Sequence, residues 1–93
     1  MTESIRPEVK LQYLGTVNEG SQLEFYTEFD GMGQIIATIL ADESDESLWL
    51  EVEISGRFVQ VPLALVKQAI EAAATEVHSE QWYKENVYSK NGV

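Results

Sequence analysis

Apolar and polar residues alternate along the first two thirds of the chain, with the two-residue period of β-strands. The pattern is clearest in "LWLEVEI" (residues 48–54), where four aliphatic side chains share one side and Trp49, Glu51 and Glu53 share the other. Turn signals separate five such stretches: "NEGS" at 18–21, "DGMG" at 30–33, "ADESDES" at 41–47 and "SG" at 55–56. We therefore expect a mainly antiparallel meander of five strands.

Alternation also assigns an apolar face to the predicted sheet. Its expected members are Leu11, Tyr13, Leu23, Phe25, Phe29, Ile35, Ile39, Leu48, Leu50, Val52 and Ile54, together with Val59 and Val61 if the last hairpin has the expected register. The stretch "QIIATIL" is apolar on both sides, because Ile36 and Leu40 alternate with Ile35 and Ile39. This pattern is typical of a central strand or of one covered on both faces.

After Pro62 the period changes to that of an amphipathic helix. Apolar residues recur at three- and four-residue steps and form one stripe: Leu63, Val66, Ala69, Ile70, Ala73 and Val77. Pro62 suits the first helical turn, where its missing N–H donor would be unpaired in any case. The stripe must be buried, and the apolar face of the sheet is the largest surface for it, so we expect the helix to pack on that face.

The length of 93 residues and the hydrophobic content of 44% fit one α+β domain. We expect a flexible N-terminus over residues 1–7, the single domain over 8–88 and a frayed C-terminus over 89–93. Within the last part of the domain, Ser79 is predicted to cap a short second helix that begins at Glu80. The segment "QWYKENVY" (81–88) is rich in aromatic residues for a tail and should pack against something.

The formal charge of −10 comes from 16 acidic and six basic residues. Such a charge repels phosphate backbones and anionic lipid surfaces, so we expect neither direct nucleic-acid binding nor membrane binding. The absence of cysteine excludes disulfides and thiol nucleophiles. No apolar run approaches a bilayer span and the N-terminus lacks a signal-peptide pattern, which makes a cytoplasmic protein the expectation.

Candidate catalytic and metal-binding groups are sparse. His78, the only histidine, is expected on the last turn of the helix, with no nucleophile placed beside it in a cleft. The acidic run "DESDES" (42–47) lacks the alternating ligands, central glycine and distal glutamate of an EF-hand loop, and "DGMG" joins two strands and opens no helix. We expect no enzymatic activity, no metal and no cofactor.

The remaining candidate for a functional site is the other face of the predicted sheet. Alternation brings aromatic rings and carboxylates together there, about 6.6 Å apart along each strand: Glu24, Tyr26, Glu28, Trp49, Glu51 and Glu53. Aromatic side chains anchor protein interfaces, and carboxylates attract basic surfaces. The pattern predicts a non-enzymatic protein-binding module, of an inhibitor, immunity or accessory type, that docks this face on a basic partner. In a sharper form, it mimics nucleic acid in the binding channel of a nuclease or other DNA- or RNA-binding effector.

Two other interpretations remain open. Trp49 and Tyr26 could form a second core with Ile36 and Leu40 under the aromatic tail. Alternatively, the sheet and helix could enclose an apolar pocket for a small ligand or serve assembly, with the acidity promoting solubility alone. An exposed Trp49 would favour the binding face and a buried one the second core. The sequence leaves the oligomeric state open.

Overall fold

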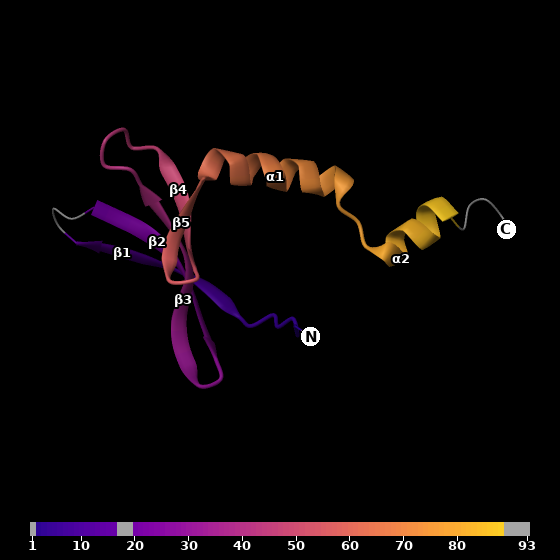
Figure 1. The fold of residues 1–93 in the computed structure, drawn as a ribbon, viewed down its shortest axis with the longest axis horizontal. Coiled ribbons are helices and arrows are strands. Elements are labelled where there is room, and N and C mark those ends of the chain that lie inside the picture. The colour runs from indigo at the N-terminus through magenta and orange to yellow at the C-terminus, as the bar shows by residue number, and fades with distance from the viewer. Residues whose placement is uncertain (1, 17–19, 89–93) are drawn as a thin grey trace.

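Five strands form where the sequence alternates, and each pairs with the next in antiparallel fashion. The computed structural model describes residues 2–16 and 20–88. Its strands are β1 (Val9–Thr16), β2 (Gly20–Phe29), β3 (Met32–Ala41), β4 (Leu48–Ile54) and β5 (Arg57–Pro62), in that order across one sheet (Figure 1). The predicted meander and the α+β class are confirmed. The expected frayed end, 89–93, lies outside the described residues.

Two tight turns set the register of their hairpins. Asp30 and Gly31 have φ angles of 54° and 74°, and Ser55 and Gly56 have 53° and 77°. Two successive positive φ angles define a type I′ turn, whose twist matches that of the flanking strands. The turns place Phe29 opposite Met32 and Ile54 opposite Arg57. In the first predicted loop, Gly20 and Ser21 belong to β2, and residues 17–19 lie outside the described part of the chain.

A bulge in β3 corrects one assignment of the sheet faces. Phe25 pairs with Ala37, but the next residue, Tyr26, pairs with Ile35, so Ile36 is an extra residue in β3. Because one inserted residue exchanges the two faces beyond it, Ile35 shares a face with Tyr26 and not with Ile39. The prediction that Ile35 belongs to the apolar face is therefore wrong.

The last hairpin has the register that the apolar face requires. Val59 pairs with Val52, and Val61 pairs with Leu50. Both valines therefore lie on the apolar face, as expected.

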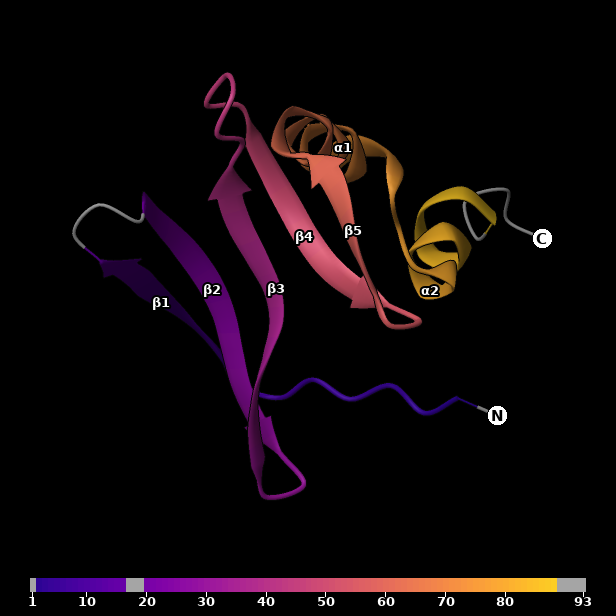
Figure 2. The same ribbon diagram turned by 60° about the vertical axis from the view of Figure 1, so that its left-hand side comes forward.

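Helix α1 (Leu63–Glu76) follows β5 without a connecting loop. Pro62 ends the strand and stands immediately before the helix with φ −55° and ψ 129°, so the prediction that it occupies the first helical turn is wrong by one position. The fixed φ of proline is compatible both with the first helical turn and with the position before it. The ψ of Pro62, however, is that of an extended residue and not of a helical one. Helix α1 contacts β4 and β5 and then extends away from the sheet (Figures 1 and 2).

Beyond α1 the chain forms a short α2 (Glu80–Tyr83) and a π-helical segment, η1 (Lys84–Tyr88). The predicted cap is confirmed, because the Oγ of Ser79 accepts a hydrogen bond from the N–H of Trp82 at 3.1 Å. Among the residues described, no helix combines the length and apolar character that a bilayer crossing requires.

The fold is open. No hydrophobic residue within 2–15 and 20–87 is buried, and the helical stripe remains largely accessible, with Ile70 66% and Val77 70% exposed. The radius of gyration is 18.5 Å, whereas a compact domain of this length has about 12 Å. The sheet and helix were expected to bury each other's apolar surfaces, but a single chain does so only where α1 meets β4 and β5.

Candidate functional site

One face of the sheet carries every acidic residue of the strands. The pairing aligns a polar row across all five strands, formed by Gln12, Glu24, Thr38, Glu51 and Gln60. We call the side of the sheet that bears this row the polar face. The six residues predicted as a contact surface, Glu24, Tyr26, Glu28, Trp49, Glu51 and Glu53, all fall on it.

Glu24 has a structural position within this face. Its residue is only 5% exposed, and its carboxylate accepts hydrogen bonds from Gln12 Nε2 at 2.9 Å and Gln22 Nε2 at 3.2 Å. Two amide donors therefore compensate the carboxylate for the water it has lost. Of the predicted contact residues, Glu24 is the one least available to a partner.

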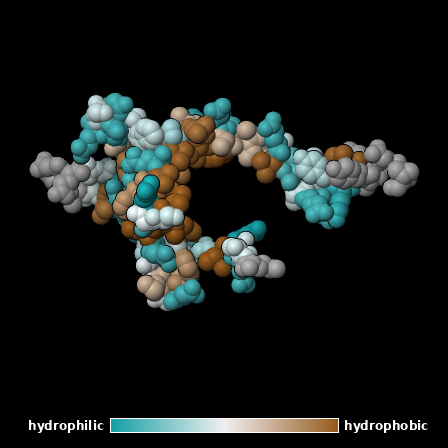
Figure 3. Space-filling view, in the orientation of Figure 1, coloured by the Kyte–Doolittle hydropathy of each residue, from teal (hydrophilic) through white to brown (hydrophobic). Residues whose placement is uncertain are grey.

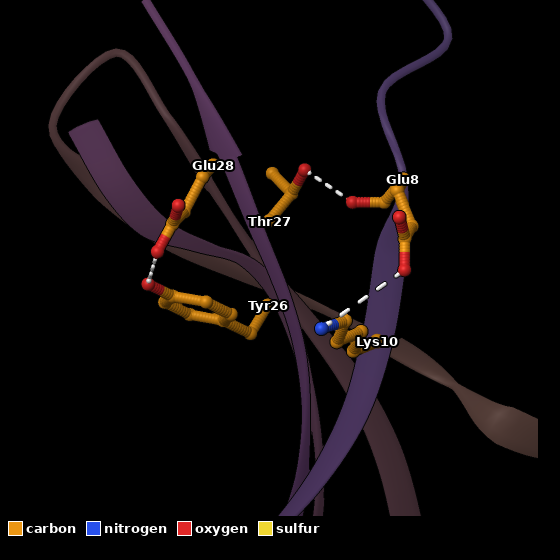
Figure 4. A network of polar contacts seen from close by, with 5 residues as sticks. All are labelled: Glu8, Lys10, Tyr26, Thr27 and Glu28. Atoms are coloured by element: carbon orange, nitrogen blue, oxygen red, sulfur yellow. Dashed lines mark hydrogen bonds and ion pairs between the residues drawn. The ribbon is translucent and has the colours of Figure 1, made fainter. Parts of the chain in front are cut away.

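Tyr26 and Glu28 form an ordered pair at the end of β2 (Figure 4). The phenol O–H of Tyr26 donates to Glu28 Oε1 at 2.9 Å. Opposite them, Gly33 leaves room for the ring, because a Cβ at that position would collide with the Tyr26 side chain. The hydrogen bond to the carboxylate raises the pKa of Tyr26 above its ordinary value of 10.0, with smaller contributions from desolvation and from the charge of Glu28.

Replacing Glu28 with glutamine is expected to lower the pKa of Tyr26 toward 10.0, because an amide does not favour the protonated phenol as a carboxylate does. A raised pKa means that the pair contributes stability below the phenol's unfolded pKa, and that this contribution disappears as pH rises through the folded value. Absorbance titration of tyrosinate measures the shift, with Tyr26→Phe identifying the relevant phenol. An identical titration of Tyr26 in both proteins would contradict the pairing.

Near the same end of the sheet, the N-terminal segment is attached to β2. Thr27, which is 1% exposed, donates from Oγ1 to the carbonyl oxygen of Glu8 at 2.7 Å, and Lys10 Nζ lies 4.0 Å from Glu8 Oε1 (Figure 4). Lys10 pairs with Tyr26 and therefore lies on the polar face. It is the one basic residue that the described strands contribute to that face.

Trp49 is half-buried and fixed in orientation. Its indole Nε1–H donates to Ser47 Oγ at 2.8 Å, and Ser47 Oγ in turn donates to Asp45 Oδ1 at 2.6 Å. In the sheet, Trp49 lies between Leu40 and Pro62. The indole is therefore neither fully exposed nor enclosed, and the role of Ser47 in holding it was missed in the sequence. Its position two residues before Trp49 was the available signal.

The other two carboxylates of β4 differ in their surroundings. Glu51 is half-buried and accepts a hydrogen bond from Gln60 Nε2 at 2.8 Å. Glu53 is exposed and lies opposite Phe58, which is 72% exposed. The β4 side of the polar face thus presents an accessible carboxylate beside accessible aromatic surface.

The acidic loop, residues 42–47, connects β3 to β4 and borders this face. Asp42 accepts from the N–H of Ser44 at 2.8 Å and Asp45 from the N–H of Ser47 at 3.0 Å. The serine side-chain and backbone hydrogen bonds hold the pKa of both aspartates below the usual value. Within 2–16 and 20–88, no cluster of three metal-ligating side chains is present.

An open depression of about 1020 Å³ borders the loop. Its lining comes from the loop itself, the paired ends of β1 and β2, the end of β3 and Gln60. The acidic loop therefore adjoins the polar face across this depression, and the other residues of the lining are uncharged.

The aromatic tail does not cover this surface. His78 stacks on Trp82 with ring centroids 3.7 Å apart, and Trp82 meets Tyr83 edge-on at 5.1 Å. Figure 1 shows α2 beyond the far end of α1, away from the sheet. The described tail aromatics thus pack on one another rather than forming a second core with Trp49.

Comparison with known protein families, curated proteins and solved structures found no significant match to this chain. Arguments about its function therefore depend on the residues and their arrangement.

Proposed function

We propose that this protein is a non-enzymatic binding module of an inhibitor or accessory type, which docks its polar face and acidic loop on a basic protein surface. The observation that supports the proposal most directly is the segregation of charge. All four strand glutamates lie on one face, next to the four acidic residues of the loop and with only Lys10 to oppose them. The same proposal places the chain in the cytoplasm, a compartment that suits a protein without cysteine.

The surface has the two components that protein recognition uses. Its exposed carboxylates would attract a basic partner and accelerate association. Trp49 would supply the anchor, and the hydrogen bond to Ser47 already holds its indole in place. Less side-chain freedom is then lost when a partner covers the ring. In this proposal Glu24 supports the face from within, while Glu28, Glu51 and Glu53 meet the partner.

A DNA- or RNA-binding effector is the sharper form of the proposed partner. Competition separates it from other basic proteins, because nucleic acid should displace the module only if both occupy the same channel. The alternative of an apolar ligand pocket between sheet and helix has less geometric support, since α1 extends away from the sheet (Figure 1).

The proposal predicts that reversing the charge of the carboxylates and removing the tryptophan anchor change different rate constants of binding. The variant Glu51→Lys with Glu53→Lys should slow association strongly at low salt and little at high salt. Trp49→Ala should instead raise the dissociation rate about 30-fold or more, as expected for loss of an interface anchor. Surface-plasmon kinetics at two ionic strengths, on the basic protein captured from native extract, measures both.

The matched control carries the same charge change elsewhere. Glu71→Lys with Glu76→Lys alters exposed positions on α1 and should leave association nearly unchanged. Equal slowing by both double variants would show that net charge alone matters and would overturn the polar face as the site. Thermal melts of each variant establish that the fold is retained.

A further inference from the structure

The apolar surfaces of this chain are exposed to an extent that a lone folded domain does not show. The accessible surface is 8195 Å² for a mass of 10.5 kDa, whereas a compact monomer of that mass exposes about 5,400 Å². The whole excess over a compact monomer is about 2,800 Å² by this relation. Part of it belongs to the extended N-terminal segment. The rest lies on the sheet, on α1 and on the α2 and η1 segments that follow it.

Two complementary surfaces account for this exposure. The apolar face of the sheet includes Leu11, Leu48 and Ile54, which are 63%, 51% and 54% exposed. The helical stripe includes Ile70 of α1 and Val77, the residue that follows the helix, and both are exposed still further. Figure 3 shows hydrophobic atoms bordering the hollow between the sheet, α1 and the N-terminal segment.

Helix α1 contacts β4 and β5 and then extends away from its own sheet (Figure 1). Helix α1 starts at Leu63, directly after the last residue of β5, so no loop is available to reverse its direction. Helix α2 and η1 lie farther still from the sheet (Figure 1). Apart from the contacts of α1 with β4 and β5, neither apolar surface covers the other within the described residues.

We infer that two copies of this chain form a closed homodimer in which α1 of each copy lies across the apolar sheet face of the other. The dimensions agree: the 14 residues of α1 span about 21 Å. Five strands at about 4.8 Å spacing make a sheet about 19 Å wide between its outer strands. A two-fold arrangement would cover the apolar sheet face and the α1 stripe of both copies at once. It would leave no uncovered surface of this kind for a third copy.

The charge distribution favours a second copy as the occupant. Each chain carries −10, so two copies repel each other least where they meet through surfaces that are free of carboxylates. The apolar face contains none of the four strand glutamates, and the stripe at Leu63, Val66, Ile70, Ala73 and Val77 contains no charge. Pairing through these surfaces leaves both acidic polar faces outside.

The excess exposed area of this chain is also comparable to the area that a homodimer interface buries. Obligate homodimers bury about 2,000–5,000 Å² in total, or about 1,000–2,500 Å² from each copy. The excess of about 2,800 Å² over a compact monomer is of that order, and the apolar sheet face and α1 both contribute to it.

Sedimentation velocity of the full chain over a wide concentration range tests the stoichiometry, and a species of twice 10.5 kDa is expected. Ile70→Asp, within the stripe, should weaken self-association about 30-fold or more, as removal of a central interface anchor does. Gln68→Asp is the matched control, because Gln68 is exposed and lies on the opposite side of the same helix from Ile70. It should leave the dimer intact.

Isotope-filtered NOE spectra of a mixture of labelled and unlabelled chains remain informative even if Ile70→Asp fails to fold. Contacts between stripe methyl groups of one copy and sheet methyl groups of the other are expected. A monomer at all concentrations would overturn the inference, whether its helix folds back on its own sheet or awaits a different protein. A dimer that shows no helix-to-sheet contacts between copies would also overturn it.

Discussion

Replacing Leu50 with alanine is expected to lower the free energy of unfolding by about 2–4 kcal/mol. Leu50 is half-buried in the middle of β4, on the apolar face, with Ile39 and Val61 beside it on the neighbouring strands. The truncation removes its contacts with both neighbours and with the helix proposed to cover this face. Chemical denaturation measures the loss. All variants are compared at one fixed protein concentration, because the unfolding free energy of a homodimer includes the free energy of association and so depends on concentration.

The control for this prediction is Leu14→Ala. Leu14 pairs with Gln22 on the polar face and is 51% exposed, so its truncation should cost far less than that of Leu50. Equal small losses for the two variants would mean that the apolar face is not covered in the folded protein, by the same chain or by another.

Replacing Glu24 with alanine is expected to cost about 2–3 kcal/mol of unfolding free energy, which is unusual for a glutamate on a strand. The substitution leaves the amides of Gln12 and Gln22 without their acceptor. Each hydrogen bond to a charged group contributes about 1.5–3 kcal/mol, and the desolvation of the carboxylate offsets part of the sum. Chemical denaturation at neutral pH measures the difference.

Two controls separate the hydrogen bonds of Glu24 from its charge. Glu24→Gln keeps one acceptor oxygen and should restore part of the lost stability. Glu53→Ala removes an equal charge from an exposed position and should change stability by about 0.5 kcal/mol or less. If Glu24→Ala behaved like Glu53→Ala, the two glutamines would not be holding the carboxylate, and Glu24 would return to the candidate contact surface.

Together, the predictions assign different tasks to the two sides of one thin sheet. The apolar face is proposed to join two copies through α1, and the polar face is proposed to meet a basic partner. A dimer built this way would display two acidic surfaces, and a bivalent partner could engage both with higher avidity than either alone. The assignment follows from the two-residue period of a strand, which sends neighbouring side chains to opposite faces.

Local signals in the sequence were sufficient for much of this architecture. The alternation in residues 48–54 places Trp49, Glu51 and Glu53 on one face whatever the rest of the fold does. The pairs Asp30–Gly31 and Ser55–Gly56 specify tight turns through backbone preferences that need no distant contact. The cap at Ser79 is equally local, because its acceptor and donor are three residues apart.

Tertiary structure decided the features that depend on partners far along the chain. The bulge that moves Ile35 to the polar face arises from pairing with β2, and alternation within β3 does not reveal an inserted residue. Glu24 looked like an accessible carboxylate until Gln12 was placed opposite it on β1. The direction of α1 is a property of its junction with β5, whereas the apolar stripe in the sequence indicates only that the helix must be covered, by its own sheet or by another chain.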